Sequence, residues 1–506
     1  MSKKREKIKA FFERLFWGKN LLNASGEESV KILQREPAPD ELVLGWAEGT
    51  DETTQETTVL PKGIKQDARD SHFYVVGATR TGKTKFLETL INQDIKNGLG
   101  FGVIDPHGDL TEDIKGYLFL LKGEEFLRKN VVLIDPTDKN NTVAFNPLER
   151  IAGEQSPRVA SELTEAFKKI WKDAWGARME DLLKNSLIAL VENNLTLAEL
   201  PLFLTDPDVQ RKVLEKVEHA VCRQYFERFN SLRLFTQNEW MESTLNKVNA
   251  FLFDDHLRQM LASPKSSFNL REIMDEGKIL LVKLDKGRFK GNADLLGSLL
   301  LAKIQAAAFS RTDTPESKRR KFYLYIDEFQ NFATESFITM LGEASKYKLS
   351  LILAHQNLAQ LLPPLRASIL SNCGLQAYFR ISRDDSNILA KESLASIYAN
   401  PPGWEWYIQQ LQELRPRICY VKNKIDGGVV EIQTIDQPPP HELAEMDEEK
   451  FTQEIAACGI GKNYLRDRKQ LEAEYTIRRD KLTRIDEPET FKEPRHKPPT
   501  RRKPLP

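Results

Sequence analysis

The sequence predicts an α/β fold in which a parallel sheet is interrupted by an all-helical insertion. Short, strongly apolar runs at residues 73–76, 101–104, 131–134, 322–326 and 349–354 each end in polar residues, the pattern of strands buried in a parallel sheet. Helical periods separate most of these runs, as crossover connections require. Between residues 156 and 269 the strand pattern stops and helical periods follow one another.

The first apolar run leads into a phosphate-binding loop. Residues 73–84 are FYVVGATRTGKT and match GxxxxGK[ST]. Glycines allow the close backbone approach that phosphate needs, and the amphipathic helix that follows points its positive end at the anion. We therefore expect ATP on this loop, with Lys83 at the β and γ phosphates and Thr84 at Mg²⁺. The expected nucleotide-binding residues are Gly77, Ala78, Thr79, Arg80, Thr81, Gly82, Lys83 and Thr84.

Composition indicates a globular protein of several domains without a global charge. The chain has 506 residues, 40% of them hydrophobic, and 74 basic side chains balance 74 acidic ones, so a polyanionic partner would need a local patch or channel. The four cysteines form no CxxC pair, which argues against a metal knuckle and fits a reducing cytosol. No apolar run approaches the roughly 18 residues of a spanning helix. The expected location is cytoplasmic, with possible peripheral contact at the inner face of the cell membrane.

The N-terminal 40 residues are expected to form a basic amphipathic helix and a linker. Within residues 3–17, KKREKIKAFFERLFW, aromatic and apolar residues recur at helical spacing among Lys and Arg. This pattern is typical of a peripheral membrane anchor and equally of a helix that packs on its own domain or on a partner. Apolar residues at 42–48 and 57–61 predict a strand or hairpin at the entrance to the core.

The next two strands end in similar polar groups. Residues 101–104 lead into Asp105, with His107 close behind, and residues 131–134 also end in Asp-Pro. Functional groups are expected at such carboxyl ends, and an acid before proline is equally an ordinary turn. After the helical stretch, strand character returns at 278–287 and an apolar helix follows.

Paired acids follow the run at residues 322–326. Asp327 and Glu328 form a Walker B arrangement, in which the first carboxylate holds the Mg²⁺ shell and the second polarises the attacking water. The next run ends in His355 and Gln356. A carboxamide there can contact both the γ phosphate and the water, so Gln356 is expected to sense the bound ATP. The paired acids and the expected sensor strand lie far from the phosphate loop along the sequence, which disfavours a small-molecule kinase.

Six segments within residues 40–437 carry a family resemblance: GATRTGKT, VIDPHGDL, FNPLE, LREIMDEGKILLVKLDKG, YLYIDEFQNF and LILAHQNLAQL. Together they resemble the HerA/FtsK superfamily of ring-forming DNA-pumping ATPases, and within it the coupling proteins of type IV secretion and conjugation. The resemblance implies a RecA-like motor core, a homo-hexamer and DNA threaded through its channel. The helical insertion is similar in position to the all-alpha domain that recognises DNA-processing complexes, so secretion-apparatus or relaxosome-like partners are expected.

The chain departs from this family in two places. Coupling proteins usually begin with transmembrane helices, so here residues 3–17 or a partner would have to provide membrane attachment. Relatives often carry Arg-Lys before the sensor strand, where this chain has Ser345 and Lys346. The arginine that completes a neighbouring subunit's site is therefore expected elsewhere. The candidates are Arg380 first, then Arg383 and Arg178.

These observations divide the chain into five parts. They are the helix and linker (1–40), the first core part with Walker A (41–155), the all-alpha insertion (156–273), the second core part with Walker B and sensor (274–440), and a charged helix with a disordered, Pro-rich basic tail (441–506). The expected function is ATP-driven DNA translocation. Two alternatives stay open: a HerA-like double-strand DNA helicase in end processing, and a protein-export ATPase or scaffold that does not act on DNA.

Overall fold

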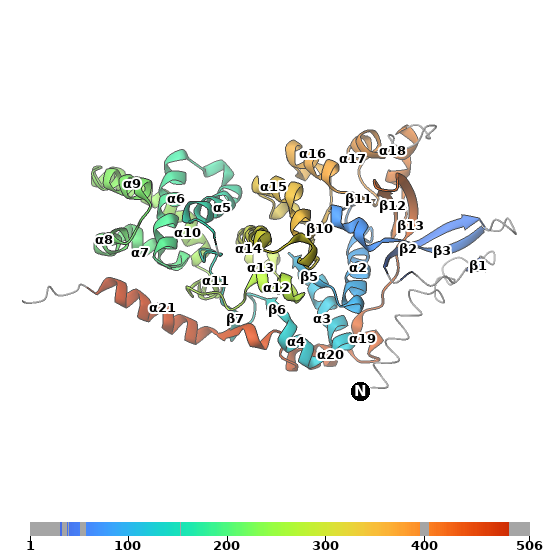
Figure 1. Cartoon of the computed structure of the whole chain (residues 1–506), viewed down its shortest axis with the longest axis horizontal. Helices are drawn as coiled ribbons and strands as arrows, with labels where there is room; N and C mark the ends of the chain where they lie inside the picture. Colours follow the sequence, from blue (N-terminus) through green and yellow to red (C-terminus); the bar gives the residue numbers. More distant parts are fainter. Residues whose placement is uncertain are drawn as a thin grey trace, which may run out of the picture.

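The computed structural model describes residues 31–32, 38, 40–50, 57–151, 153–394 and 404–484. The predicted amphipathic helix at residues 3–17, most of the linker after it and the Pro-rich tail from residue 485 lie outside this part of the chain. Within it, a large sheet with covering helices forms one half of the molecule and a group of helices forms the other (Figure 1). The predicted α/β class with a helical insertion is confirmed.

The described residues form a 12-stranded sheet in the order β1-β3-β2-β13-β12-β11-β4-β10-β9-β5-β8-β6. Its part from β11 to β6 is parallel. Strands β2 and β3, where the sequence predicts a strand or a hairpin, form an antiparallel hairpin. In chain order the strands are β1 (Lys31–Ile32), β2 (Glu41–Thr50), β3 (Thr57–Lys65), β4 (Phe73–Val76), β5 (Gly100–Asp105), β6 (Val131–Ile134), β7 (Asn141–Val143), β8 (Ile279–Lys283), β9 (Phe322–Ile326), β10 (Leu349–His355), β11 (Leu375–Tyr378), β12 (Ile418–Asn423), β13 (Gly428–Gln433) and β14 (Leu465–Asp467).

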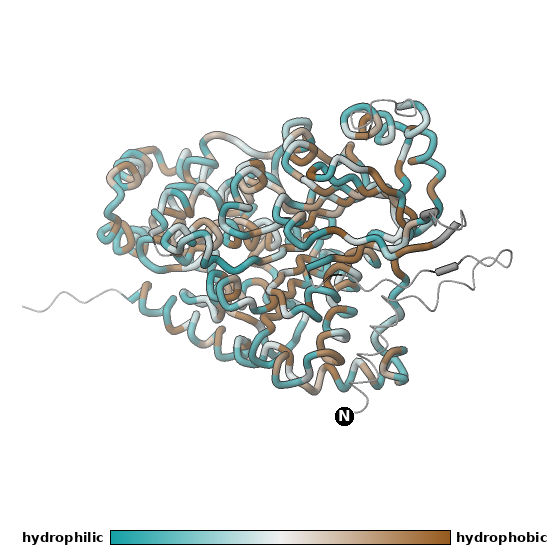
Figure 2. Tube along the Cα trace, turned by 45° about the vertical axis from the view of Figure 1, so that its right-hand side comes forward, coloured by the Kyte–Doolittle hydropathy of each residue, from teal (hydrophilic) through white to brown (hydrophobic). Residues whose placement is uncertain are grey.

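Alternate residues of the central strands face two different hydrophobic cores. In β4, Tyr74 and Val76 belong to one core and Phe73 and Val75 to the other, because successive side chains of a strand point to opposite faces. All four side chains are fully buried, which explains why this strand is apolar throughout. Figure 2 shows that hydrophobic segments concentrate in the interior of the molecule.

The helices of the sheet domain cover both faces. Helices α2, α3 and α4 supply the core that contains Phe73, and α14, α15 and α16 supply the core that contains Tyr74. These and the remaining helices of this half are α2 (Lys83–Asn97), α3 (Asp109–Lys122), α4 (Glu124–Asn130), α13 (Lys286–Phe289), α14 (Gly291–Phe309), α15 (Ser336–Glu343), α16 (Pro363–Asn372), α17 (Arg383–Leu389) and α18 (Trp404–Glu413).

The described residues between β7 and β8 form only helical elements. Helix starts are set locally: the Asp206 side chain accepts from the N–H groups of Asp208 and Val209, and Asp254 and Asn269 cap α11 and α12 in the same way. The longer helices are α5 (Ser156–Ile170), α6 (Ala177–Glu192), α7 (Leu200–Thr205), α8 (Pro207–Glu215), α9 (Ala220–Asn230), α10 (Leu234–Leu252), α11 (Asp255–Leu261) and α12 (Leu270–Glu276).

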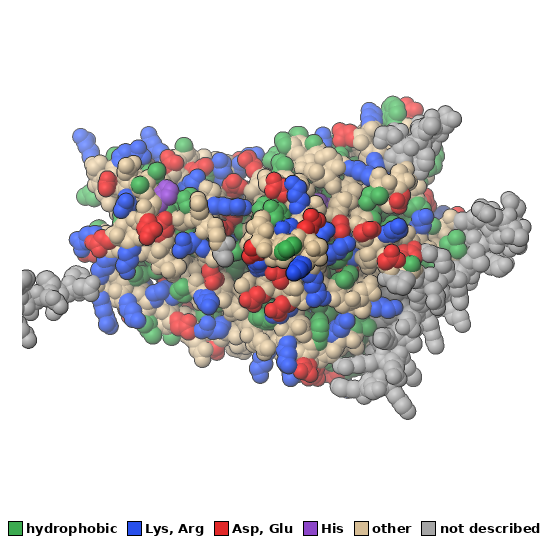
Figure 3. Space-filling view, viewed as in Figure 1, with side chains coloured by type: hydrophobic (Ala, Val, Ile, Leu, Met, Phe, Trp, Pro, Cys, Tyr) green, Lys and Arg blue, Asp and Glu red, His purple; other side chains and the backbone are tan. Residues whose placement is uncertain are grey.

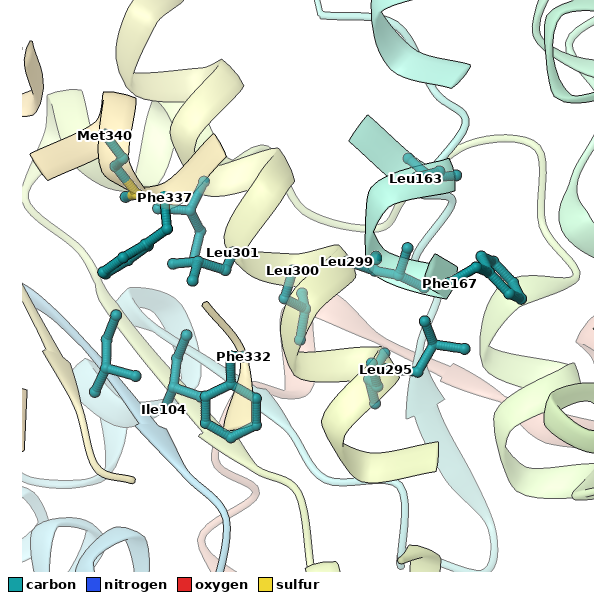
Figure 4. Packing of buried hydrophobic residues seen from close by; sticks show 14 of the residues in the cluster. Ile104, Leu163, Phe167, Leu295, Leu299, Leu300, Leu301, Phe332, Phe337 and Met340 are labelled. Atoms are coloured by element: carbon teal, nitrogen blue, oxygen red, sulfur yellow. The ribbon is translucent and has the colours of Figure 1, made fainter. Parts of the chain in front are cut away.

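Helix α14 packs the insertion against the sheet. Figure 4 shows Leu295 and Leu299 on the side of Phe167 from α5, whereas Leu301 lies toward Phe337 of α15. The sequence predicts no apolar run of membrane-spanning length, but among the described residues the stretch from Gly291 to Asp313, which includes α14, is one helix that is long and apolar enough to cross a membrane. Of its most apolar window, 78% is buried inside the fold. Its composition is thus that of a core helix.

The C-terminal part of the described chain contacts both halves. The sequence predicts only a charged helix here, and the structure adds α19 (Pro440–Leu443), α20 (Glu448–Ala457) and β14 before that helix, α21 (Arg468–Thr483). Strand β14 pairs antiparallel with β7. Arg468 is buried and donates to the carbonyl oxygens of Pro136 and Asp138, near the sheet, and of His256 in the insertion. Helix α21 then runs along the insertion (Figure 1).

A buried ion pair ties the helix after the phosphate loop to the strand before the paired acids. Arg69, in the short helix η1 (Gln66–Ser71), and Asp94 of α2 are fully buried, with Arg69 nitrogens 2.7 and 3.1 Å from the two carboxylate oxygens. The Tyr325 hydroxyl of β9 donates to Asp94 at 2.6 Å and accepts from Arg69 at 2.9 Å. Arg69 and Asp94 compensate each other's desolvation, so removing either one leaves an uncompensated buried charge.

Replacing Arg69 with Met should therefore destabilise the protein by about 3–5 kcal/mol, because Asp94 stays buried without its cation. Thermal unfolding of the two proteins in parallel measures the effect. The matched control is Lys129→Met, which removes the surface pair with Glu125 and should leave the unfolding midpoint unchanged. An Arg69→Met variant as stable as the wild type would show that the pair does not hold α2 against β9.

Candidate active site

The phosphate loop lies between β4 and α2, as predicted. Gly82 has a φ of 109°, a conformation that favours glycine, and a Cβ added there would make a tight contact, 3.2 Å from the Cα of Arg417. Lys83 begins α2, and its ammonium group donates to the carbonyl oxygens of Gly77 at 2.6 Å and Ala78 at 3.2 Å. Burial lowers the pKa of Lys83, opposed by the carboxylates of Glu328 and Asp327. The amine is thus within the loop, facing the acids.

The paired acids are buried at the carboxyl end of β9. Asp327 and Glu328 are 8% and 6% exposed. Burial, together with the nearby carboxylates of Glu328 and Asp105, raises the pKa of Asp327 to about 7. Glu328 has a φ of 46°, a left-handed conformation that is costly for a residue with a Cβ and is often found where a side chain must be aimed. Because the two carboxyl groups are shielded from water, a cation that binds beside them stabilises their charged forms.

A chain of hydrogen bonds connects the loop, Gln356 and Glu328. The hydroxyl of Thr79 donates to the Gln356 carbonyl oxygen at 3.1 Å, and the Gln356 amide donates to Glu328 Oε1 at 2.8 Å. The amide of Gln330 donates to the other oxygen, Oε2, at 2.7 Å. The structure therefore brings together Thr79, Gln356 and Glu328, which the sequence predicts for this site. It adds Gln330, to which the sequence assigns no role.

His355 fixes the end of β10. Its Nε2 lies 2.5 Å from the hydroxyl of Tyr74 in β4, and its ring contacts Phe329 edge-on at 5.1 Å between centroids. Burial lowers the pKa of His355 to about 3, so the ring is neutral at neutral pH. Its side chain thus connects β10 to β4 and to the segment that follows Glu328. Because His355 directly precedes Gln356 in the chain, these contacts also fix the position of Gln356.

Asp105 forms a strand-ending turn. Its Oδ1 accepts from the N–H groups of His107 and Gly108 at 2.9 and 2.8 Å, and its Oδ2 from Thr111 at 2.8 Å. These bonds cap the start of α3, while His107 is exposed. Asp105 still acts on the site through its charge, which contributes to the raised pKa of Asp327.

The three candidate arginines lie in different places. The carbonyl oxygen of Arg380 accepts from the Ala78 N–H of the loop at 2.8 Å, and its side chain is exposed. Arg383 is exposed at the start of α17. Arg178 lies on α6 of the insertion, with its guanidinium 5.4 Å from the ring centroid of Trp240. Of the three, Arg380 directly adjoins the phosphate loop.

Sequence reasoning missed a second wall of the nucleotide pocket. A cavity of about 260 Å³ is lined by residues 80–85 and, from the loop before β12, by Pro416 and Arg417. The Arg417 N–H donates to the carbonyl oxygen of Thr81 at 2.7 Å, and the guanidinium, 42% exposed, pairs with Asp436 at 2.5 Å. The segment LRPRICY carries no local motif, so only the fold reveals that it adjoins the loop.

The protein groups fit a metal that is held jointly with a nucleotide. In the part of the chain that the structure describes, no cluster of three or more His, Cys, Asp or Glu side chains could hold an ion by itself. Mg²⁺ in phosphate-transfer sites typically takes one or two protein oxygens and completes its shell with phosphates and water. Asp327, a buried acid with a raised pKa, and the hydroxyl of Thr84 are the side chains suited to that role.

Comparison with known proteins agrees with this geometry. A family model for the type IV secretion-system coupling protein DNA-binding domain matches residues 58–393. The plasmid coupling protein TrwB in complex with the non-hydrolysable ATP analogue ADPNP has a similar structure, with a TM-score of 0.54 and 17% identity over 79% of this chain and 96% of that one. VirB4 of Thermoanaerobacter pseudethanolicus has a TM-score of 0.51 and 14% identity, covering 82% and 100% of the two chains.

A further TrwB structure, in complex with ADP and Mg²⁺, has a TM-score of 0.50 and 17% identity over 75% of this chain and 89% of that one. No curated protein sequence matches the chain significantly. At these identities the similarity to solved structures establishes the fold, a P-loop core with helical additions, and leaves the chemistry to be argued from the residues above.

Replacing Arg417 with Ala should weaken ATP binding about tenfold, since a guanidinium at the pocket wall can contribute a charge-assisted hydrogen bond worth ~1.5 kcal/mol. Titration with a fluorescent ATP analogue measures the dissociation constant. Arg415→Ala, at an exposed position two residues earlier, is the matched control and should bind as the wild type does. Equal affinity of the Arg417 and Arg415 variants would remove Arg417 from the nucleotide site.

Proposed function

The chain belongs to the family of type IV secretion-system coupling protein DNA-binding domains, and from this premise we propose that it hydrolyses ATP to move DNA. The observation that carries the proposal is the convergence of Lys83, Glu328 and Gln356 at one edge of the sheet, with Asp327 beside them. TrwB, which has the same fold, is known in complex with ADP and Mg²⁺. The residue types that bind phosphate, hold a metal and activate water in phosphoryl transfer meet at this edge, and the completing arginine would come from a neighbouring subunit.

Each residue has a role that follows from its position. Lys83 and the loop N–H groups bind the phosphates. To do so, the ammonium group of Lys83 exchanges its present bonds to the carbonyl oxygens of Gly77 and Ala78 for bonds to phosphate oxygens. Thr84 and Asp327 would hold Mg²⁺, which when bound would neutralise phosphate charge. Glu328 accepts the proton of the attacking water, and Gln356 turns its amide from Glu328 to the γ phosphate and the water. Thr79 holds the other end of the Gln356 amide.

The mechanical part of the proposal is a homo-hexameric ring that pumps DNA. An exposed arginine beside a phosphate loop is available to a neighbouring subunit, so Arg380 is the arginine proposed to complete the adjacent site. Such an arginine raises the hydrolysis rate by about 10³-fold or more. Lys, Arg, Asp and Glu are interspersed over the face in Figure 3, which agrees with a DNA path confined to a local channel.

Partners and location extend the same proposal. We assign the helical insertion to contact with a secretion-apparatus or relaxosome-like complex. We further propose cytoplasmic residence with peripheral membrane contact through residues 3–17, whose sequence is basic and amphipathic. The family match favours this role over a HerA-like helicase in end processing.

Replacing Glu328 with Gln should leave ATP binding intact and slow hydrolysis at least about 100-fold, because the variant lacks the general base. Phosphate release gives the rate, and titration with a fluorescent ATP analogue gives the affinity. The isosteric amide keeps the shape of the site. A variant that hydrolyses ATP at the wild-type rate would show that another group activates the water.

Hydrolysis should also increase several-fold when DNA is added, since a motor couples its ATP cycle to its track. Rates with single-stranded DNA, double-stranded DNA and no DNA compare the cases directly at one salt concentration. A rate that responds to neither form of DNA would contradict the translocase proposal and favour a protein-export ATPase or scaffold.

A further inference from the structure

Glu328 is held from two sides by amide groups. Gln356 donates to Oε1 and Gln330 to Oε2, at 2.8 and 2.7 Å. The other end of the Gln330 amide, Oε1, is buried without a hydrogen-bond partner among the described residues. Turning that amide over would place its oxygen against the carboxylate, so the contact with Glu328 alone fixes its orientation. Among the described residues, the Gln330 side chain thus makes its hydrogen bond to Glu328 alone.

The backbone of Gln330 is held in turn by the helical insertion. Its carbonyl oxygen accepts from the ammonium group of Lys169 at 2.9 Å. Lys169 stands near the end of α5, the first helix of the insertion, and burial lowers its pKa to about 7. One turn earlier on α5, Glu165 lies beside Ser336 at the start of α15, whose polar groups oppose the rise that burial causes in the pKa of Glu165. Two consecutive turns of α5 thus contact the segment that follows Glu328.

We propose that Gln330 is a positioning residue for Glu328 and that Lys169 of the helical insertion sets the position of Gln330. This inference rests on the proposed function, ATP hydrolysis with Glu328 as the base. It assigns the insertion a second role besides partner contact: its first helix acts on the base through Gln330. A partner that moves α5 would change the hydrolysis rate through this contact.

The direction of the effect follows from the two hydrogen bonds. When ATP binds, Gln356 leaves Oε1 for the γ phosphate, and Oε1 becomes free to take the proton of water. The bond from Gln330 to Oε2 then remains to keep the carboxylate from rotating away. Without it, the carboxylate samples other orientations and fewer of them face the water. Loss of Gln330 should consequently lower kcat and leave nucleotide binding unchanged.

The test compares four single variants of the full chain by steady-state ATP hydrolysis. Gln330→Ala should lower kcat about tenfold with KM within twofold of the wild type, and Lys169→Met should lower it about threefold in the same way. Lys169→Arg keeps a donor and should restore most of the rate. The matched control is Lys168→Met, because Lys168 is exposed on the same helix and pairs with Glu180; its kcat should equal that of the wild type.

A double variant distinguishes the relay from two independent effects. If Lys169 acts through Gln330, adding Lys169→Met to Gln330→Ala should cause no further loss of kcat. Losses that multiply would overturn the relay, as would a kcat of Lys169→Met equal to that of the Lys168 control. Thermal unfolding and ATP affinity are measured for each variant, so a loss of folding is recognised. If Gln330→Ala does not fold, Gln330→Asn, which keeps the amide but shortens its reach, carries the same test.

The outcome also separates this inference from the proposed function. A wild-type protein that hydrolyses no ATP would contradict the proposed function and this inference with it. A wild type that hydrolyses ATP, together with Gln330 and Lys169 variants of unchanged kcat, would overturn the inference alone.

Discussion

The parallel register of three strands is the constraint on which the site depends. In β4 and β10, Val76 lies opposite His355, and in β10 and β9, Leu353 lies opposite Ile326. Because the strands are parallel, their carboxyl ends meet at one edge of the sheet. The phosphate loop, the sensor and the paired acids each begin within two residues of these positions. A shift of β9 by one residue would reverse its buried faces and turn the acids away from the loop.

Polar contacts below and beside the sheet edge maintain this register. On one face, the Arg69–Asp94 pair and Tyr325 join α2 to β9, so the helix that carries Lys83 and the strand that leads to Asp327 are fixed to each other. At the edge itself, His355 and Tyr74 join β10 to β4. The contact of Lys169 with Gln330 extends the same network to the insertion. Hydrogen bonds and an ion pair therefore connect the residues of the site to α2, to β4 and to the helical insertion.

The sequence predicts those parts of the site whose signal is contiguous. An apolar strand followed by glycines, Lys83 and Thr84 defines the loop, and Asp327, Glu328 and Gln356 each follow an apolar run, so a pattern of a few residues is sufficient. Arg417 and Lys169 reach the site only through tertiary packing, and no spacing along the chain marks them. Arg468 illustrates the same limit in the fold: one arginine among the charged residues at the start of α21 carries no sign that it is buried between the sheet domain and the insertion.

We propose that this edge of the sheet binds ATP. On binding, Glu328 loses its hydrogen bond from Gln356 and keeps the one from Gln330. A structure of the protein with a non-hydrolysable ATP analogue and Mg²⁺ tests this proposal most directly. We expect the γ phosphate within hydrogen-bond distance of Lys83, the Gln356 amide turned from Glu328 toward that phosphate, and the Gln330 bond to Glu328 retained. An analogue bound on the loop with both amides still on Glu328, or with Gln330 released instead of Gln356, would contradict it.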